Sequence, residues 1–274
     1  MSYATLLVHV DADGEMGSRV RLAAGLADRF QSHLIGVAAW MPRPAFAVEG
    51  VVIDPEPTVE ELDQMRALLN KRGEQFKTVL GPDRRQVEWR SSLDFPTEFV
   101  AREARAADLV IIGRDRTSYD PYRSTDSGAL ILRTGRPVLA VPPGIESVAI
   151  KRVAIAWKDS REARRAVQDA LPFLHSAKEI ILVEVTETGT EQDTQRHLKD
   201  VANYLARHRI TTVAERVRPI EGTASNALLR LVEEESVDLI VAGAYGHSRL
   251  GEWIFGGMTQ DLLARSPVCC LLSN

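Results

Sequence analysis

The sequence contains an internal repeat, and this feature limits more than any other what the chain can fold into. The segment "ADLVIIGRDRTSYDPYRSTDSGALILRTGRPVLAV", which begins at Ala107, aligns without a gap with "VDLIVAGAYGHSRLGEWIFGGMTQDLLARSPVCCL", which begins at Val237, 130 positions later. Self-similarity at a fixed separation indicates that the chain is built from two copies of one unit. A length of 274 residues also suits two domains of ordinary size.

The beginnings of the two copies also match, but at a different separation. "TLLVHVD" from Thr5 resembles "RVAIAWK" from Arg152, which is 147 positions later, so the first copy contains 17 additional residues. The simplest place for them is the proline-bearing segment 41–57, which we expect to be an ordered excursion or a mobile loop. Two prolines and a glycine at 142–144 interrupt regular structure before the second copy. We therefore predict domains at residues 1–144 and 145–274.

Within each copy, short β-branched runs alternate with longer segments of helical period, which is typical of successive strand and helix units around a parallel sheet. Runs such as "DLVIIG" and "DLIVAG" are apolar throughout, as expected for strands covered by helices on both faces. The predicted fold is α/β, with two tandem doubly wound parallel sheets. Strands are expected at 4–10, 33–39, 86–90, 108–113, 137–141, 152–157, 179–185, 212–217, 238–243 and 267–272, and helices at 15–31, 58–80, 95–106, 125–134, 160–174, 191–208, 222–235 and 256–265.

Charge and composition exclude several classes of partner. A formal net charge of −4 with scattered arginines offers no basic patch for nucleic acid. No apolar stretch approaches the roughly 18 to 20 residues of a membrane span, and the N-terminus lacks a signal-like segment, so we expect a cytoplasmic protein. The two cysteines, Cys269 and Cys270, are neighbours on a predicted strand and are interpreted as buried apolar residues.

The most informative candidate site is a glycine-spaced loop in the second copy. In an open parallel sheet, ligands bind beyond the carboxyl ends of the strands, where the strand order reverses. At two such ends lie "AWKDS" and "GAYGHS", and from Gly243 the spacing is G-x-x-G, nine residues, and two glycines that begin a helix. Such a loop can surround phosphates with backbone N–H groups. The candidate binding residues are Ala156, Lys158, Asp159, Gly243, Gly246, His247, Gly256 and Gly257.

With this motif the chain resembles the universal stress protein family, specifically its tandem members, and the resemblance covers nearly the whole chain. The ATP-binding branch of that family has G-x-x-G, nine residues, then glycine and serine or threonine, with an aspartate after the first strand. The resemblance implies a Rossmann-like, adenine nucleotide alpha hydrolase-like domain with five strands in each copy. It also implies an intrachain pseudo-dimer in which "PVLAVP" and "PVCCLL" pair, and ATP or a related adenine nucleotide, with magnesium, as ligand of the second domain.

Both copies depart from the family motif. In the second copy Gly257 stands at the hydroxyl position and Lys158 at the aspartate position, so Lys158 either faces a phosphate or forms a surface pair with Asp159. The first copy keeps Asp11 at the aspartate position but has Arg116 and Asp126 in place of two motif glycines. We therefore predict that the first loop does not bind ATP. Its Arg114 and Arg116 either bind a smaller anion or pair with neighbouring aspartates.

Other residues of the second site have two interpretations each. His247 is either a phosphate contact or a local hydrogen-bonding residue, and Trp157 is either an adenine neighbour or a core residue. No nucleophile, base and orienting group can be assembled, and neither a P-loop nor a G-x-G-x-x-G after the first strand is present. We expect no dedicated catalytic machinery and no metal site; the further alternative, slow nucleotide hydrolysis, requires a water-positioning residue that the sequence does not identify.

The resulting hypothesis is a stress-response or regulatory protein whose second domain binds an adenine nucleotide. Its expected partners are that nucleotide, further copies of itself and unidentified proteins, with neither nucleic acid nor membrane. The alternative is a ligand-free scaffolding or interaction protein in which both nucleotide sites are degenerate; Gly257 and Arg116 favour it.

Overall fold

The computed structural model describes residues 2–43, 46–48, 51–54, 56–82, 84–114, 119–186, 191–220, 222–246 and 257–274. The first half contains β1 (Thr5–His9), α1 (Gly17–Phe30), β2 (His33–Ala39), β3 (Phe46–Val48), β4 (Val51–Asp54), α2 (Val59–Leu80), β5 (Val87–Ser92), α3 (Pro96–Glu103), η1 (Ala104–Ala106), β6 (Leu109–Gly113), α4 (Ser127–Arg133) and β7 (Val138–Val141). The second contains β8 (Arg152–Trp157), α5 (Arg161–Asp169), α6 (Leu171–Ser176), β9 (Glu179–Thr186), α7 (Glu191–Arg207), β10 (Val213–Pro219), α8 (Ala224–Glu234), β11 (Leu239–Gly243), α9 (Gly257–Arg265) and β12 (Cys269–Ser273).

The two halves share one continuous sheet of ten strands in the order β10-β9-β8-β11-β12-β7-β6-β1-β2-β5. All its neighbouring strands are parallel except β7 and β12, which pair antiparallel through Leu139 opposite Leu271. The predicted α/β fold and the pairing of the last strands are thus confirmed, with the correction that the two five-stranded sheets join into one. This joining removes two edge strands that would otherwise be exposed. The domain boundary at 144 stays a prediction.

The strand register shows that the repeat in the sequence is also a repeat in the structure. Leu6 of β1 lies opposite Leu109 of β6, and Val153 of β8 lies opposite Leu239 of β11. These pairs differ by the same 147 and 130 positions as the two matching segments of sequence. Each half therefore places its first and fourth strands side by side, in the same register.

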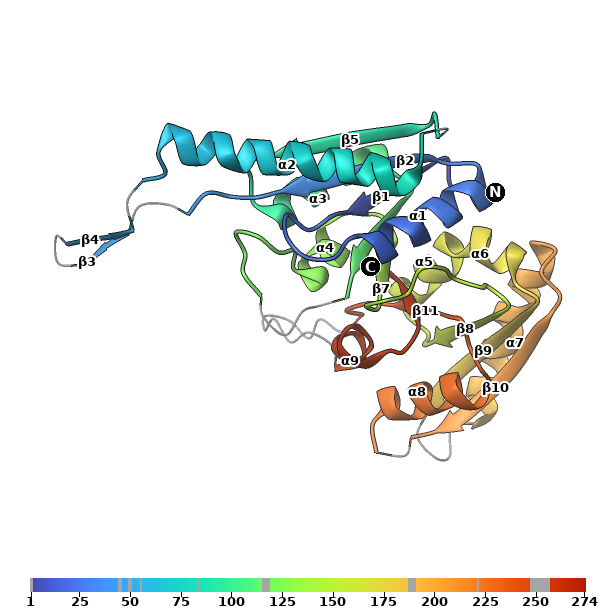
Figure 1. The fold of residues 1–274 in the computed structure, drawn as a ribbon. Coiled ribbons are helices and arrows are strands. Elements are labelled where there is room, and N and C mark those ends of the chain that lie inside the picture. Colours follow the sequence, from blue (N-terminus) through green and yellow to red (C-terminus); the bar gives the residue numbers. More distant parts are fainter. Residues whose placement is uncertain are drawn as a thin grey trace.

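Helices cover both faces of the sheet, as Figure 1 shows. Successive strand residues point to opposite faces, so Leu6 and Val8 belong to one core layer, which also contains residues of α1, α2, α5, α6 and α7. Leu7 and Ile112 belong to the other layer, with residues of α3, α4, α8 and α9. No helix in the described part of the chain is both long enough and apolar enough to cross a membrane.

Helix starts follow local sequence signals. Thr58 and Glu61 form a capping box at α2, and Ser160 caps α5 by accepting a hydrogen bond from the N–H of Ala163. One helix prediction is wrong: the helix expected at 160–174 ends at Asp169 and restarts as α6 at Leu171. Pro172 in the first turn of α6 explains the break, because its ring removes a donor and crowds the preceding turn.

An aromatic cluster joins the two halves on one face of the sheet. The rings of Tyr3 and Phe30 from the first half and Phe173 from α6 have centroids 5.2 to 5.6 Å apart. The hydroxyl of Tyr3 donates to the carbonyl oxygen of Asp169 at 2.5 Å. Burial raises the pKa of Tyr3 well above its usual value of 10, and the nearby carboxylates add to this effect.

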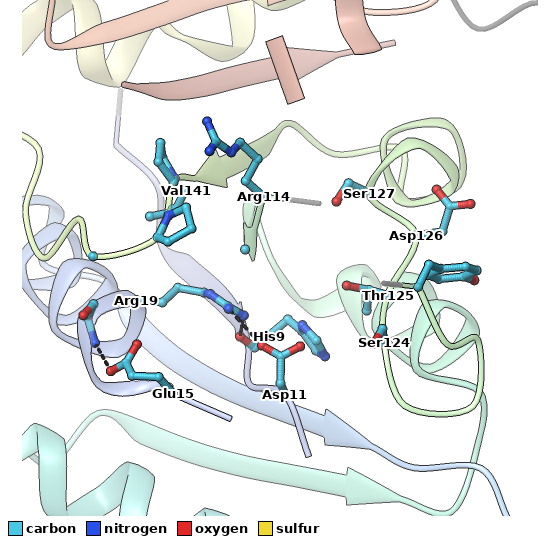
Figure 2. Close-up of a pocket in the computed structure, with 16 residues that line it drawn as sticks. His9, Asp11, Glu15, Arg19, Arg114, Ser124, Thr125, Asp126, Ser127 and Val141 are labelled. Atoms are coloured by element: carbon cyan, nitrogen blue, oxygen red, sulfur yellow. Dashed lines mark hydrogen bonds and ion pairs between the residues drawn. The ribbon is translucent and has the colours of Figure 1, made fainter. Parts of the chain in front are cut away.

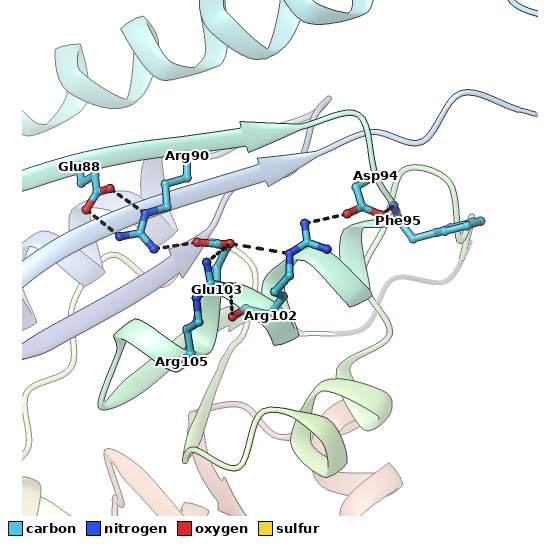
Figure 3. A network of polar contacts seen from close by, with 7 residues as sticks. All are labelled: Glu88, Arg90, Asp94, Phe95, Arg102, Glu103 and Arg105. Atoms are coloured by element: carbon cyan, nitrogen blue, oxygen red, sulfur yellow. Dashed lines mark hydrogen bonds and ion pairs between the residues drawn. The ribbon is translucent and has the colours of Figure 1, made fainter.

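A network of charges lies between edge strand β5 and helix α3 (Figure 3). The carboxylate of Glu103, whose side chain is 8% exposed, accepts from Arg90 at 2.7 Å and lies 3.2 Å from Arg105. Arg90 also pairs with Glu88 at 2.7 Å. The arginines thus compensate the charge of the buried Glu103 carboxylate. The network lies at β5, the last strand in the order of the sheet.

The segment 41–57 holds the additional residues of the first copy. β3 and β4 lie in it as an antiparallel pair outside the main sheet. In the second half the corresponding connection, between β9 and α7, is only residues 187–190. The described residues therefore fit the ordered excursion of the two predicted alternatives.

Candidate functional site

The strand order reverses between β1 and β6 in the first half and between β8 and β11 in the second. The carboxyl ends of these strand pairs are the places where an open α/β sheet leaves a crevice. In the second half Lys158 and Asp159 follow β8, and Gly243 ends β11. The fold therefore brings the two predicted motif segments of the second copy to one edge of the sheet.

The first motif glycine of the second half is required by packing. A Cβ added at Gly243 would lie 2.5 Å from the backbone nitrogen of Ala163 and 2.6 Å from the carbonyl carbon of Glu162. These are backbone atoms of the first turn of α5, which cannot move aside as a flexible side chain does. Gly243 thus allows α5 to begin directly against the end of β11, which is sufficient reason for a glycine at this position.

The second motif glycine lies against an acidic side chain. A Cβ at Gly246 would be 2.7 Å from Oε2 of Glu162 and 3.5 Å from Oγ of Ser160. The side chain of Glu162 is only 9% exposed and pairs with Arg161 at 3.0 Å. A phosphate held by the backbone near Gly246 would therefore meet a carboxylate, a feature that no motif in the sequence indicated.

The remaining described candidates differ in exposure. Ala156 is the penultimate residue of β8, opposite Ala242, and is partly buried. Lys158 and Asp159 are exposed, and Asp159 accepts a hydrogen bond from Arg164 at 2.5 Å. Asp159 is therefore held by Arg164 of α5.

Beside these residues lies a polar group that the sequence interpretation missed. Glu184, near the end of β9, is opposite Trp157 of β8, and its Oε2 has no hydrogen-bond partner among the described residues. Burial raises the pKa of the Glu184 carboxyl, the charge of Asp159 adds to this effect, and His197 opposes it. Trp157 is 8% exposed and belongs to the core, with its indole nitrogen buried and also lacking a described partner. A polar residue at the end of an apolar strand is the signal that could have identified Glu184.

The helix that follows the glycine loop begins at the edge of the crevice. Gly257 is the first residue of α9 and is exposed, and a Cβ added there would meet no described atom within 4 Å apart from its own helix and chain neighbours. His247 and Gly256 were also predicted binding residues, and both lie outside the described residues. Gly256 precedes α9 in the sequence and has no side chain with which to cap it.

The first half contains a cavity of about 400 Å³ at the corresponding place. Figure 2 shows Arg19, His9 and Asp11 on one side and Ser127, Thr125 and Ser124 on the other. The described lining carries two arginines, Arg19 and Arg114, and three acids, Asp11, Glu15 and Asp126. This excess of one acid is unfavourable for a ligand with several phosphates.

Arg19 occupies the floor of this cavity. Its guanidinium donates to the carbonyl oxygen of His9 at 2.8 Å and pairs with Asp11 at 2.9 Å, with side chains 16% and 10% exposed. A Cβ at Gly113 would be 2.5 Å from the same guanidinium. Asp11, which stands at the aspartate position of the family motif, is therefore already paired with Arg19. The residue 147 positions after Arg19 is Ala166, so the second half has no such arginine.

The helix end of the first cavity is also occupied by protein groups. Asp126 caps α4 by accepting from the N–H of Ala129 at 2.9 Å. Arg114 donates to the carbonyl oxygen of Ser266 in the second half at 2.5 Å, a contact that neither predicted alternative for this residue included. Arg116 lies outside the described residues. Among the described residues, no group of three or more metal-binding side chains is present.

Comparison with protein families identifies one match. The model of the universal stress protein family matches residues 149–273, which contain β8 to β12 and the second glycine motif. Universal stress protein Slr1230 of Synechocystis sp. is 25% identical over 171 residues, which are 59% of this chain. The match spans 56% of that relative, so this chain covers little more than half of its length.

Two solved structures share the arrangement of the whole chain. A universal stress protein from Archaeoglobus fulgidus superposes with a TM-score of 0.72 at 16% identity, covering 98% of this chain and 96% of that one. A protein of unknown function from Pseudomonas aeruginosa superposes with a TM-score of 0.62 at 14% identity, covering 98% and 92%. At these identities the likeness shows the fold, and it extends over both halves.

Proposed function

We propose that this chain, whose second half matches the universal stress protein family, is a regulatory protein whose second half binds ATP or a related adenine nucleotide. The observation that carries the proposal is the convergence of two segments at the reversal of strand order. Gly246 follows β11 and lies against Ser160 and Glu162. These two residues come directly after Lys158 and Asp159 in the sequence. A ligand at this edge can contact both segments at once.

Differences between the halves support the choice of the second. In the first half Arg19 covers Gly113 and neutralises Asp11, and Asp126 already accepts from the N-terminus of α4. The second half has Ala166 in place of Arg19. Its helix α9 has nine residues and begins at an exposed glycine. The partial positive charge of that helix end favours an anion.

Each described candidate residue has a role in this proposal. The backbone N–H groups near Gly246 and at the start of α9 hold phosphates, and Lys158 supplies a positive charge beside them. Magnesium would accompany the phosphates as part of the ligand. Glu184 of β9 and Trp157 of β8 lie opposite one another, and each has a buried polar atom without a partner among the described residues. We assign no catalytic role, and regulation would follow from a conformation that the nucleotide favours when it binds.

The proposal is tested with a thermal melt of the protein with and without millimolar ATP and magnesium. A ligand at about 100 times its dissociation constant adds about 2.7 kcal/mol of stability, which raises the melting temperature by several degrees. The blocking variant is Gly246→Arg, which installs the residue that the first copy has at position 116. Gly246→Ala is the matched control, since the described atoms nearest to its Cβ belong to the movable carboxylate of Glu162 and the hydroxyl of Ser160.

We expect a shift in the parent and in Gly246→Ala, and none in Gly246→Arg. Absence of a shift in nucleotide-free parent protein would refute the proposal. That result would favour the alternative, a ligand-free scaffolding or interaction protein, for which the packing role of Gly243 and the carboxylate of Glu162 already provide support.

A further inference from the structure

Tyr245, a residue of the second glycine motif, reaches into the first half. Its hydroxyl oxygen lies 2.5 Å from where a Cβ of Gly128 would be, and the ring carbon that carries this oxygen lies at 3.5 Å. Gly128 belongs to the first turn of α4 in the first half, whereas Tyr245 directly precedes Gly246 of the motif. The motif of one half is therefore seated on a helix of the other half.

This contact explains a glycine that α4 itself does not require. Gly128 is buried, and its φ is not positive, so its backbone conformation is open to any residue. Glycine makes a helix less stable than alanine does. The equivalent residue of α9, 130 positions later, is Met258, which has a large side chain. Apart from its own helix and chain neighbours, the described atom nearest to the missing Cβ of Gly128 is the hydroxyl oxygen of Tyr245.

The backbone of Tyr245 has a conformation that needs support. Its φ of 59° lies in the left-handed region, which bulky residues rarely adopt. Such a conformation persists only where the surrounding structure holds it. Two contacts do so here: the ring lies against Gly128, and the N–H of Tyr245 donates to Oγ1 of Thr259 in α9 at 3.4 Å. If the ring is displaced, the backbone is free to relax, and the N–H of Gly246 moves with it.

A second contact crosses between the halves in the opposite direction. Arg114, which follows β6 in the first half, donates to the carbonyl oxygen of Ser266 at 2.5 Å. In Figure 2 the side chain of Arg114 points away from Asp11 and toward the second half. Ser266 directly follows α9, so this cation lies at the C-terminal end of the helix, where positive charge is favourable. The first half thus contacts both the motif before α9 and the end of α9.

We propose that Tyr245 is a positioning residue through which the first half sets the nucleotide affinity of the second, an inference that rests on the nucleotide site proposed above. Seated against Gly128, Tyr245 holds the backbone from Ala244 to Gly246 in the conformation that presents its N–H groups to a phosphate. The first half therefore has a role in the site without binding ATP itself.

The first test uses the protein without ligand and compares alanine substitutions at two helical glycines in thermal melts. Gly25→Ala is the matched control, because Gly25 is exposed in α1 and its added Cβ meets no described atom within 4 Å apart from its own helix and chain neighbours. It should raise the melting temperature by roughly 2 °C, since alanine favours a helix. Gly128→Ala should lower the melting temperature, because its Cβ displaces the ring of Tyr245.

Tyr245→Phe provides the rescue. It removes the hydroxyl and keeps the ring, whose nearest listed carbon lies at an ordinary contact distance of 3.5 Å from the added Cβ. In the Tyr245→Phe background, Gly128→Ala should therefore no longer lower the melting temperature. A Gly128→Ala variant that is more stable than the parent, or a loss that persists in the Tyr245→Phe background, overturns the contact.

The second test measures ATP affinity in the presence of magnesium by isothermal titration calorimetry. Gly128→Ala should raise the dissociation constant about tenfold, although it changes only the first half. The same substitution in the Tyr245→Phe background, and Gly25→Ala in the parent, should leave the dissociation constant unchanged. An unchanged dissociation constant in Gly128→Ala, with ATP bound by the parent, overturns the positioning role alone. Absence of ATP binding in the parent overturns the nucleotide site and this role with it, whereas the melts decide on the contact independently of any ligand.

Discussion

The charge of Glu162 provides the sharpest test of the proposed nucleotide site in the second half. Its Oε2 lies 2.7 Å from where a Cβ of Gly246 would be. A phosphate that accepts a hydrogen bond from the backbone there, at about 2.9 Å, would have its charge roughly 7 Å from the carboxylate. With an effective dielectric constant of about 40, one phosphate charge is repelled by about 1.2 kcal/mol. Glu162→Gln should therefore tighten ATP binding about sevenfold.

The substitution keeps the shape of the side chain and changes only its charge. Arg161, which pairs with Glu162 at 3.0 Å and is 81% exposed, retains its positive charge in the variant, so the local charge rises by one. Isothermal titration calorimetry with ATP, AMP and adenosine measures the effect. The gain should be largest for ATP and absent for adenosine, which carries no phosphate.

The first half contains a natural control for this experiment. Glu15 occupies the position 147 residues before Glu162 and accepts a hydrogen bond from the N–H of Ser18 at 3.0 Å. Glu15→Gln should leave ATP affinity unchanged, because we place no nucleotide in the first half. The reasoning is refuted if Glu162→Gln leaves ATP affinity unaltered, or if adenosine binding improves by the same factor.

Three further predictions follow from buried polar groups. Burial raises the pKa of Tyr3 well above 10, so above pH 10 the unfolded chain loses the phenolic proton while the folded chain keeps it. The contribution of Tyr3 to the free energy of unfolding is therefore complete below pH 10 and falls above it. Urea unfolding of Tyr3→Phe should therefore show a shallower loss of stability between pH 10 and 11.5, by up to about 1.4 kcal/mol per pH unit, and an unchanged slope would contradict this. Burial raises the pKa of both Cys269 and Cys270 to about 12, so neither thiol should react with a disulfide reagent within minutes at pH 8 until the chain is unfolded. Glu103→Ala should cost about 2 to 4 kcal/mol in chemical denaturation, because it removes the carboxylate that holds Arg90 at 2.7 Å; a cost below about 0.5 kcal/mol would show that the pair contributes nothing.

The architecture could be predicted from the sequence because it depends on local and repeated signals. Apolar strands and helical periodicity can be recognised within ten to twenty residues of sequence. The separations of 147 and 130 positions identified equivalent strands before any contact was known. The break before α6 was not predicted, because the helical pattern of apolar residues on either side of Pro172 indicated one continuous helix despite the proline. The length difference between the copies located the additional residues in segment 41–57, although that difference contains no information about strands β3 and β4.

The sequence by itself thus determined the two-copy α/β fold, the burial of the cysteines and the edge of the sheet at which the candidate binding segments meet. Only the tertiary structure decided what fills that edge in each half. Arg19 reaches Gly113 across 94 positions of sequence, and Glu162 reaches Gly246 across 84, because α1 and α5 each begin against a neighbouring strand. Such contacts depend on how elements pack and on which rotamer fills the space between them, and no local pattern encodes that.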